Sequence, residues 1–565
     1  MRERATDVDV AIIGGGVNGT GVARDLALRG VRVALFEKND LAFGASGNSS
    51  GMIHGGVRYL LTHPSVTRDS CRDSGYIQRI APHLLFRIPF VMPFAGGNLA
   101  RRIYFDLADA FFRAYDDYVP LKHGKPHVRL TADELAELEP GLVGDFAGGL
   151  AFDEWGTDGA RLCALNALDA REHGASIHVH TEVVEILLEQ DGPRRRAIGV
   201  RHRDALGGTV STTSAKLVVN ASGAWGPLTG ALAGVPLRVR PGKGIHLVFD
   251  RRLTNYAIAV NAIDGRQVFL EPWQNVSVLG TTDDDYYGDL DDVRPTADEV
   301  RYLVQAIARV FPPIRRARIT SIYTGVRPTL WAYGPNEDTL SREHEIVDHA
   351  SEARGGVRGL YSMIGGKLAS YRAFAEQMSD ELARVLGVDA RCTTHVASLP
   401  GGTTIPDAFA LAERAEISPI AARRAIYRHG ERAERLVARI VDAPAEARAV
   451  CACEPVLEAE VRHVIREEHA RTVSDVARRT RLGLGPCGGM RCALRCGQIV
   501  AEETGASQAV GRRQAIRFLL RQRALRAPGL GPEQARQEAL SIQALASQVG
   551  EEAVRDPSRA DTGEA

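Results

Sequence analysis

The sequence has no excess of either charge, with 70 Lys and Arg residues against 70 Asp and Glu residues in a chain of 565. A balanced chain has no overall positive field to attract nucleic acid, so we expect no nucleic-acid partner. The sequence also lacks a run of about 18 apolar residues, the length that a membrane-spanning helix needs. Its polar start leaves no room for the apolar segment of a signal peptide. We therefore predict a cytoplasmic protein, or one bound peripherally to the cytoplasmic face of a membrane.

Cysteine is scarce, with eight residues in the whole chain. In a long sequence without a secretion signal this number argues against a disulfide scaffold. Three cysteines are scattered, which is typical of small buried apolar side chains: Cys71, Cys163 and Cys392. The other five lie between positions 451 and 496, and this clustering indicates a separate role.

The first forty residues contain a complete βαβ pattern. An apolar strand pattern at 8–13 meets a glycine turn, and a helical pattern and a second strand pattern at 31–36 follow, ending at Glu37. Three glycines permit the tight turn, the approach of a pyrophosphate and close helix–strand packing, in that order: Gly14, Gly16 and Gly19. The helix N-terminus offers N–H groups to phosphates, and Glu37 can accept hydrogen bonds from a ribose. The pattern predicts a dinucleotide site, for NAD or FAD.

The segments that follow favour a flavin over a nicotinamide. Residues 38–59 are too rich in Gly and Ser for a buried strand and fit a loop around a large planar ligand. Strand patterns at 217–219 and 360–364 also end in glycine turns, and the second could place a helix N-terminus against the flavin N1/O2 edge. The candidate FAD contacts are Gly14, Gly16, Gly19, Glu37, Ser46, Asn48, Ser50, Gly51, Ile53, His54, Gly223, Trp225, Gly366, Lys367 and Leu368.

Several motifs occur together across residues 8 to 385: GGGVNG with Glu37, SGMIHGGVRYL, KGIHLVF, LGTTDDDYYGD, GVRPTL, SREHEI and GGKLASYR. In this set the chain resembles the FAD-dependent glycerol-3-phosphate dehydrogenases. The resemblance implies an α/β fold: a Rossmann-like FAD-binding domain of the glycine/D-amino-acid oxidase type, an inserted α+β substrate domain, and a mostly helical C-terminal domain. It also implies oxidation of sn-glycerol 3-phosphate to dihydroxyacetone phosphate by hydride transfer to flavin N5. Electrons would pass to a quinone or to electron-transfer subunits.

The resemblance also assigns a substrate pocket. Its candidate substrate-binding residues are Arg58, Tyr59, His246, Arg327, Arg342 and Lys367. Planar guanidinium groups suit a dianionic phosphate, and we count Arg58, Arg327 and Lys367 as catalytic as well. His246 is the candidate base because the ordinary pKa of histidine lies near neutrality. The acidic residues at 283–289 are interpreted as a structural turn rather than a metal site.

A second hypothesis is a related flavoprotein that oxidises an amino acid or a 2-hydroxy acid. Such a substrate needs carboxylate recognition but no clamp for a dianion, so the number of cations in the pocket separates the two. Under this alternative the cysteine-rich region is a docking or metal module without an electron-transfer role.

The clustered cysteines follow the pattern C-x-C-x33-C-x4-C, formed by Cys451, Cys453, Cys487 and Cys492. Helical patterns at 455–469 and 472–481 separate the two pairs, which could present four thiolates to an Fe–S cluster or to zinc. The spacing and the lead-in to Cys487 resemble the [2Fe-2S] domain of bacterioferritin-associated ferredoxin, which also occurs in the large chain of anaerobic glycerol-3-phosphate dehydrogenase. Zinc remains an alternative, although it usually takes more widely spaced pairs. Cys496 is a fifth, spare cysteine that leaves the fourth ligand open.

The expected domain order is a discontinuous FAD-binding and substrate domain, a helical linker region, the [2Fe-2S] domain, a helical C-terminal region and a disordered tail. Their residues are 1–385, 386–447, 448–500, 501–550 and 551–565. One further segment, 84–118, is rich in Phe and Tyr with interleaved Arg. One interpretation is a surface that contacts a bilayer or a membrane protein partner. We prefer the other interpretation, in which the segment supplies core residues and a helix of the substrate domain.

Overall fold

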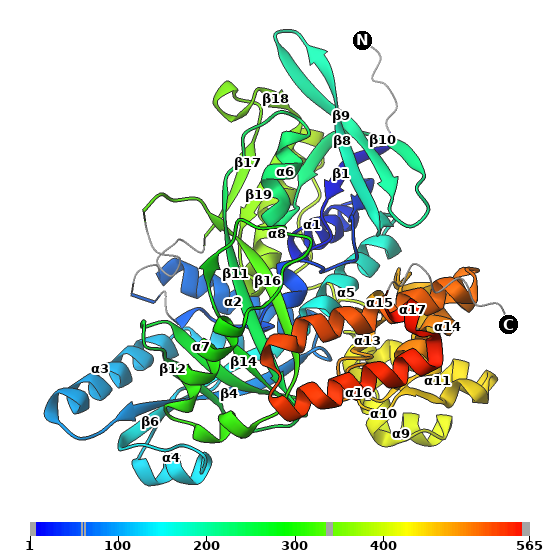
Figure 1. Cartoon of the computed structure of the whole chain (residues 1–565). Coiled ribbons are helices and arrows are strands. Elements are labelled where there is room, and N and C mark those ends of the chain that lie inside the picture. Colours follow the sequence, from blue (N-terminus) through cyan, green and yellow to red (C-terminus); the bar gives the residue numbers. More distant parts are fainter. Residues whose placement is uncertain (1–6, 58–59, 62–63, 335–342, 556–565) are drawn as a thin grey trace.

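The computed structural model describes residues 7–57, 60–61, 64–334 and 343–555. Two β-sheets lie side by side, and a helical C-terminal region packs along one flank of both (Figure 1). The chain passes repeatedly between the sheets, so neither is formed by a continuous segment. The predicted fold class, an FAD-type α/β domain with an inserted α+β domain and a helical C-terminal domain, is confirmed.

The first sheet is parallel at its centre, in the order β17-β19-β10-β1-β2-β7, with β17 antiparallel at the edge. Its strands are β1 (Val8–Ile13), β2 (Val33–Phe36), β7 (Ser176–His178), β10 (Val210–Asn220), β17 (His344–Asp348) and β19 (Leu360–Gly365). The outer part of β10 continues into an antiparallel layer with β8 (Thr181–Asp191), β9 (Arg194–Asp204) and β18 (Val357–Arg358). The strand patterns expected at 8–13 and 360–364 are therefore present.

Helices cover one face of this sheet, and the β8–β9 layer covers the other. The helices are α1 (Val17–Leu28), α5 (Gly159–Glu172) and α8 (Tyr371–Leu386). Val10, Ala11 and Ile12 are completely buried because β1 is covered on both sides. This is why a parallel strand reads as a nearly continuous apolar run rather than an alternating one.

The second sheet has ten strands in the order β15-β11-β14-β13-β12-β4-β6-β3, with β16 added beside β11 and β5 beside β6. These are β3 (Met52–Ile53), β4 (Leu85–Ala95), β5 (Val128–Leu130), β6 (Phe146–Thr157), β11 (Val239–Phe249), β12 (Ala257–Asn261), β13 (Gln267–Trp273), β14 (Val276–Gly280), β15 (Asp284–Asp285) and β16 (Ile319–Leu330). The accompanying helices are α2 (Pro64–Ile80), α3 (Leu99–Asp116), α4 (Ala132–Leu138) and α7 (Ala297–Ala308). The short helix α6 (Gly226–Ala231) packs instead against β10 and β19 of the first sheet.

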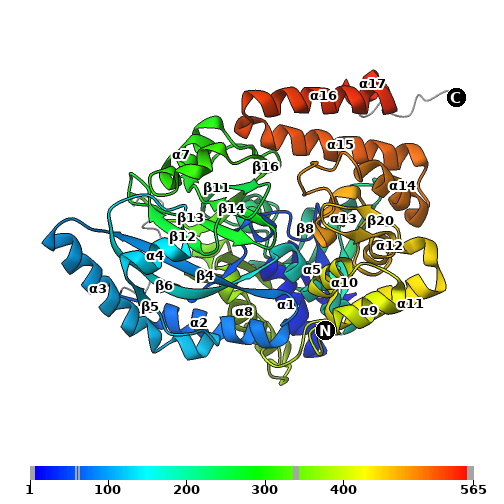
Figure 2. The ribbon, with the colours of Figure 1, turned by 90° about the horizontal axis from the view of Figure 1, so that it is seen from below.

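The aromatic segment 84–118 forms β4 and α3, and α3 projects from the body beside the second sheet (Figures 1 and 2). Phe105 and Phe112 face the core, where Phe105 stacks on Phe94 and Phe112 packs at a tilt against Phe152. The opposite face of α3 exposes Leu99, Ile103 and Leu107, one helical turn apart. One face of α3 therefore belongs to the core, as in our preferred interpretation, and its other face is exposed to solvent.

The C-terminal region is helical, as expected. It contains α9 (Ala408–Ala415), α10 (Pro419–His429), α11 (Ala433–Asp442), α12 (Glu458–Glu467), α13 (Val473–Thr480), α14 (Ala493–Thr504), α15 (Gln508–Arg526), α16 (Pro532–Val549) and α17 (Glu551–Arg555), with the short hairpin β20 (Ala449–Cys451) and β21 (Val456–Leu457). We expected a disordered tail from residue 551, but residues 551–555 form the helix α17, because Ala553 packs against Ile516. Residues 556–565 of that tail lie outside the described residues.

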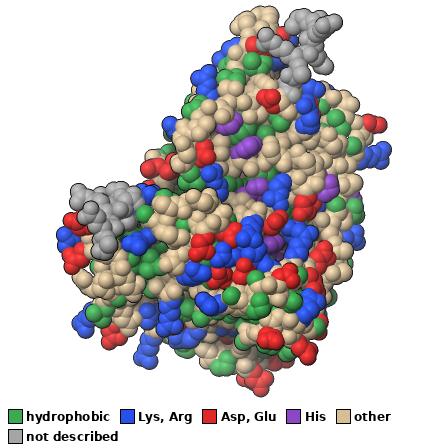
Figure 3. All heavy atoms as spheres, turned by 90° about the vertical axis from the view of Figure 1, so that its right-hand side faces the viewer, with side chains coloured by type: hydrophobic (Ala, Val, Ile, Leu, Met, Phe, Trp, Pro, Cys, Tyr) green, Lys and Arg blue, Asp and Glu red, His purple; other side chains and the backbone are tan. Residues whose placement is uncertain are grey.

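The molecular surface shows Lys and Arg interleaved with Asp and Glu, as seen over the face in Figure 3. No helix among the described residues is long and apolar enough to cross a membrane.

Candidate functional site

A cavity of about 690 Å³ lies where the carboxyl ends of β1, β10 and β19 face the second sheet. This is the position at which open α/β sheets bind their ligands. Thirteen candidate FAD contacts line it: Gly14, Gly16, Glu37, Ser46, Asn48, Ser50, Gly51, His54, Gly223, Trp225, Gly366, Lys367 and Leu368. His246 and Arg327 line it as well. Gly19 and Ile53 lie behind its wall, Ile53 with its side chain in the core.

The dinucleotide wall is built by backbone. Gly14 has φ +115°, and a Cβ there would lie 2.5 Å from the Ala221 carbonyl oxygen. A Cβ on Gly19 would lie 2.0 Å from the Gly14 carbonyl oxygen, so α1 can approach the turn only if this residue is glycine. Gly16 opens into the cavity, where its nearest neighbour is the Ser46 hydroxyl. These clearances fit the pyrophosphate of a dinucleotide.

Glu37 closes the ribose end of this wall. Its carboxylate accepts hydrogen bonds from the Gly15 N–H at 2.7 Å and the Asn39 N–H at 2.8 Å, which fix its orientation. Burial raises the pKa of Glu37, and the two N–H donors oppose that rise. Because it lines the cavity at the end of β2, the carboxylate can accept hydrogen bonds from a ribose. The residues present therefore fit FAD.

The opposite wall is built by side chains on the second sheet. His246 is 2% exposed, and its ring stacks on Tyr323 with centroids 4.8 Å apart. Within the described part of the chain, neither ring nitrogen has a hydrogen-bond partner. Burial, with a smaller contribution from the positive charge of Arg327, lowers the pKa of His246 to about 3. Gly280 leaves the space that the ring needs, since a Cβ there would lie 2.2 Å from His246 Cδ2.

Arg327 is held rigidly beside this histidine. Its guanidinium donates to Asp283 Oδ1 at 2.8 Å and to Thr281 Oγ1 at 3.0 Å. It crosses β11 at Gly244, where a Cβ would lie 2.5 Å from Arg327 Nη2. The acidic segment 283–289 therefore orients a cation, and among the described residues it contains no grouping of ligands suited to a metal.

Sequence reasoning missed a buried charge network that contacts the Gly- and Ser-rich segment at Gly55. Glu154 lines the cavity and accepts hydrogen bonds from the Gly55 N–H at 3.1 Å and the Tyr115 hydroxyl at 3.0 Å. Lys122, completely buried, pairs with the same carboxylate at 2.9 Å. Arg266 was missed too: it lines the cavity and donates to the Asp283 carbonyl oxygen at 2.6 Å. None of them belongs to a motif.

Three predicted substrate residues lie outside the described residues: Arg58, Tyr59 and Arg342. Of the described ones, His246, Arg327 and Lys367 converge on the cavity from β11, β16 and the turn after β19.

Comparison with known proteins decides the family. Residues 9–372 match the family model "FAD dependent oxidoreductase", and 392–510 match "C-terminal domain of alpha-glycerophosphate oxidase". Over 515 residues the chain is 33% identical to a component of the anaerobic glycerol-3-phosphate dehydrogenase of Escherichia coli K12, covering 90% of this chain and 91% of the relative. A relative from Haloferax volcanii, likewise named as one component of this enzyme, is 32% identical over 510 residues, covering 87% and 83%.

The chain belongs to the FAD-dependent glycerol-3-phosphate dehydrogenase family. A solved glycerol-3-phosphate dehydrogenase from Bacillus halodurans, in complex with FAD, shares its fold with a TM-score of 0.73 at 24% identity, covering 93% of this chain and 96% of that one. This chain is accordingly an FAD-dependent oxidoreductase.

The family comparison does not show a bacterioferritin-associated-ferredoxin-like domain. A single model spans residues 392–510, across the expected boundary at 447/448. The expected domain limits remain predictions, and so does the cluster.

The structure nevertheless gathers the four predicted cysteine ligands into two pairs. Cys453 and Cys487 have their sulfurs 3.7 Å apart. Cys451 and Cys492 form the second pair: the neighbouring Cys492 thiol and the backbone N–H groups of Gly483, Glu454 and Cys453 lower the pKa of Cys451. The Cys492 thiol itself donates to the Gly489 carbonyl oxygen at 3.6 Å. Cys496, the spare cysteine, is buried on α14, and its pKa is raised by that burial.

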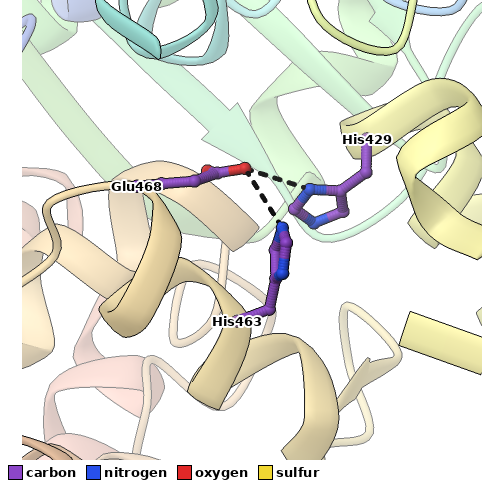
Figure 4. A group of neighbouring side chains, drawn as sticks. All are labelled: His429, His463 and Glu468. Carbon is purple, nitrogen blue, oxygen red and sulfur yellow. Dashed lines mark ion pairs between the residues drawn. The ribbon is translucent and has the colours of Figure 1, made fainter. Parts of the chain in front are cut away.

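One further cluster has the spacing of metal ligands. His429, His463 and Glu468 place three ligand atoms within 4.8 Å of one another (Figure 4). The Glu468 carboxylate, however, already pairs with the Arg161 guanidinium, which also lies 3.4 Å from His429 Nδ1. A guanidinium between the candidate ligands opposes a dication. We interpret the cluster as an ion network that joins α5 of the FAD domain to the C-terminal region.

Proposed function

We propose that this chain oxidises sn-glycerol 3-phosphate to dihydroxyacetone phosphate, with FAD as the oxidant. Family membership supports the reaction, and one observation of the cavity supports the assignment of roles: an unpartnered, neutral His246 beside a fixed Arg327. When bound, the flavin supplies the hydride acceptor at N5. The remaining tasks, holding a phosphate dianion and removing the hydroxyl proton, fall to side chains.

Arg327 binds the phosphate in this proposal, with Arg266 and Lys367 adding positive charge to the same cavity. A guanidinium held by Asp283 and Thr281 is already oriented, so little side-chain entropy is lost on binding. An amino acid or 2-hydroxy acid would need one cation for its carboxylate. Four described cations line this cavity, of which Lys38 lies next to Glu37 at the ribose end and the other three are Arg266, Arg327 and Lys367.

His246 takes the hydroxyl proton. In the free protein burial, and to a smaller extent the positive charge of Arg327, disfavours a positive charge on the imidazole and lowers the pKa of His246. A bound dianion offsets that charge, so phosphate binding raises the pKa of His246 towards the range of a useful base. The proton acceptor is thus strengthened only when the phosphorylated substrate is present.

Anaerobic mixing of the FAD-loaded protein with candidate substrates tests the proposal. We expect sn-glycerol 3-phosphate to bleach the flavin absorbance, whereas glycerol, a 2-hydroxy acid and an amino acid at equal concentration leave it unchanged. Bleaching by lactate or an amino acid, without bleaching by glycerol 3-phosphate, would favour the second hypothesis.

We further propose that Cys451, Cys453, Cys487 and Cys492 hold a [2Fe-2S] cluster. Each iron of such a cluster takes two of the four cysteines, and the sulfurs lie in two pairs. A single zinc ion would need all four sulfurs about 3.8 Å apart, given Zn–S bonds of about 2.3 Å. Among the described residues no three of these sulfurs meet within 4.8 Å.

Iron and acid-labile sulfide analysis of anaerobically purified protein tests this site. We expect about two of each per chain, lost in Cys453→Ser while glycerol 3-phosphate still reduces the flavin. Cys163→Ser is the matched control, because Cys163 is a buried cysteine of the FAD domain. Zinc in place of iron, or full iron in Cys453→Ser, would contradict the proposal.

The electron acceptor is proposed by analogy with the Escherichia coli and Haloferax volcanii relatives, whose names place them in multi-subunit enzymes. We propose that electrons leave towards a quinone through partner subunits or a peripheral membrane contact.

The exposed row Leu99, Ile103 and Leu107 on α3, beside Arg101 and Arg102, has the chemistry of an interfacial helix. Ile103→Glu should reduce co-sedimentation with anionic lipid vesicles, and an unchanged bound fraction would remove α3 from this role.

A further inference from the structure

The C-terminal region contacts, from outside the cavity, the loop that follows Glu37 at the ribose end of the dinucleotide wall. Asp40, three residues after Glu37, is completely buried. Its carboxylate accepts two hydrogen bonds from Arg479, at 2.9 and 2.7 Å, and one from Arg478 at 2.7 Å. Both arginines belong to α13, more than 430 residues away in the sequence. Asp40 is thus the point at which the loop after Glu37 is fastened.

The same helix holds this loop at a second point. Asp475 of α13 pairs with His180 Nε2 at 2.7 Å. The backbone N–H of His180 donates to the Asn39 carbonyl oxygen at 2.6 Å. Asp475 also accepts a hydrogen bond from Arg478 at 3.2 Å, which joins the two fastenings into one buried network.

Contacts between the C-terminal region and this loop extend to the cavity wall. Phe43, which lines the cavity, lies under the guanidinium groups of Arg478 and Arg521, 5.8 and 5.4 Å from its ring centroid. The Ala42 N–H meanwhile donates to the Gly15 carbonyl oxygen in the glycine turn. The loop from Glu37 to Phe43 therefore lies between the dinucleotide turn and α13.

We propose that Asp40 and Arg479 are positioning residues for FAD, through which docking of the C-terminal region sets the affinity for the cofactor. Neither needs to touch the cofactor. They hold the backbone of residues 38–40, and so the Glu37 carboxylate, in the geometry that accepts a ribose. If the network is broken, FAD must order the loop itself, and its apparent affinity falls by the fraction of molecules in which the loop is ordered.

Reciprocity gives a consequence in the unmodified protein. If docked α13 favours FAD, bound FAD must favour docked α13 by the same factor. Amides of residues 473–480 should therefore exchange hydrogen more slowly when FAD is added to the apoprotein. Amides of α9, which lies elsewhere in the C-terminal region, should not change.

Equilibrium titration of apoprotein with FAD, followed by flavin fluorescence, tests the proposal in variants. Asp40→Asn should bind FAD about tenfold more weakly or worse, because it weakens charge-assisted hydrogen bonds to both arginines. Arg478→Gln is the milder variant, since Arg479 keeps its two bonds to Asp40, and a loss of about threefold is expected. Arg462→Gln is the control: its ion pairs with Glu458 and Glu503, at 2.7 Å each, lie within the C-terminal region.

The control separates positioning from general destabilisation. Arg462→Gln should lower the unfolding midpoint of the apoprotein without changing its FAD affinity by more than about twofold. The proposal would be overturned if Asp40→Asn and Arg462→Gln lost equal FAD affinity. It would also be overturned if Asp40→Asn and Arg478→Gln both kept the FAD affinity of the wild type. If Asp40→Asn fails to fold, Arg478→Gln and the exchange measurement decide: unchanged protection of 473–480 on FAD addition contradicts it.

Discussion

The two walls of the cavity are made from different parts of the chain. The dinucleotide wall is backbone: a turn at Gly14, an open position at Gly16 and the N-terminus of α1. The substrate wall is side chain: His246 and Arg327, presented by β11 and β16 and oriented by neighbours such as Asp283. The first wall fits a group shared by all dinucleotides, whereas the second distinguishes one substrate from another. Changes in the first should therefore abolish binding, and changes in the second should alter rate and selectivity.

The largest expected effect is on the backbone wall. Gly14→Ala places a Cβ 2.5 Å from the Ala221 carbonyl oxygen at φ +115°, so the turn must move and the purified protein should contain no flavin. Gly30→Ala is the control, because Gly30 also has a positive φ, +78°, but no described residue other than its chain neighbours has an atom within 4 Å of the added Cβ. We expect it to lose about 1 kcal/mol of stability and to keep its flavin. A Gly14→Ala protein that is purified with a full complement of flavin would refute the assignment of this wall to the dinucleotide.

A smaller effect is expected on the side-chain wall. His246→Gln should lower kcat by about 10²- to 10⁴-fold, the usual contribution of a general base, with little change in flavin content. Steady-state rates with an artificial electron acceptor and the flavin-to-protein absorbance ratio measure the two quantities. Loss of flavin with an unchanged kcat per bound flavin would contradict the division between the walls.

The pH profile sharpens this prediction. Burial and Arg327 lower the pKa of His246 to about 3, so the free protein keeps the imidazole neutral from pH 5 to 8. The profile of kcat/KM, which reports the free enzyme, should therefore show no acid limb near pH 6.5 from this residue. A limb near 6.5 that disappears in His246→Gln would show that the histidine titrates normally.

Stability against pH compares the walls with the domain interface, where buried histidines gather. Burial lowers the pKa of His83 and His463 to about 3 and of His469 to about 4. These groups stay neutral in the folded protein but take up protons below about pH 6.5 in the unfolded chain. Stability should therefore fall as the pH falls from 6.5 towards 4, with an opposing contribution from His180, whose pKa Asp475 raises against the effect of burial.

Urea unfolding at pH 7 and pH 5 measures this dependence. We expect a lower midpoint at pH 5, and a smaller difference between the two midpoints in His463→Gln, which removes one of the depressed groups. An equal or higher midpoint at pH 5 in the wild type would mean that these imidazoles are protonated in the folded protein.

The smallest effect is expected at the exposed end of the cavity. Asp291 pairs with Lys38 at 2.6 Å and accepts a hydrogen bond from Trp225 at 3.1 Å, but half of its side chain is exposed. Asp291→Asn should change FAD affinity by about threefold or less, since exposed pairs contribute about 1 kcal/mol at most. Titration with FAD checks it, and a loss as large as that in Asp40→Asn would show that this end is not open to solvent.

The sequence predicted the backbone wall better than the side-chain wall. Glycines that allow a turn have a fixed spacing within one βαβ unit, so Gly14, Gly16 and Glu37 could be identified from local pattern alone. Gly244 and Gly280 make room for Arg327 and His246, but their need arises from strands that meet only in the folded sheet.

The charge networks were not predictable for the same reason. Lys122 and Glu154 lie 32 residues apart in a helical turn and a strand without motif character. Asp40 and Arg479 lie 439 residues apart. Nothing local marks either residue as buried, because charged side chains are ordinarily found at the surface. The helical C-terminal region, by contrast, was predictable from its apolar periodicity.

The most direct test of the account is single-turnover flavin reduction by glycerol 3-phosphate and by glycerol, in the wild type and in Arg327→Ala. The account predicts that the wild type strongly prefers the phosphorylated substrate. It predicts that Arg327→Ala loses about 100-fold or more of that preference, mainly through slower reduction by glycerol 3-phosphate. An unchanged preference in Arg327→Ala would contradict the claim that this side chain reads the phosphate.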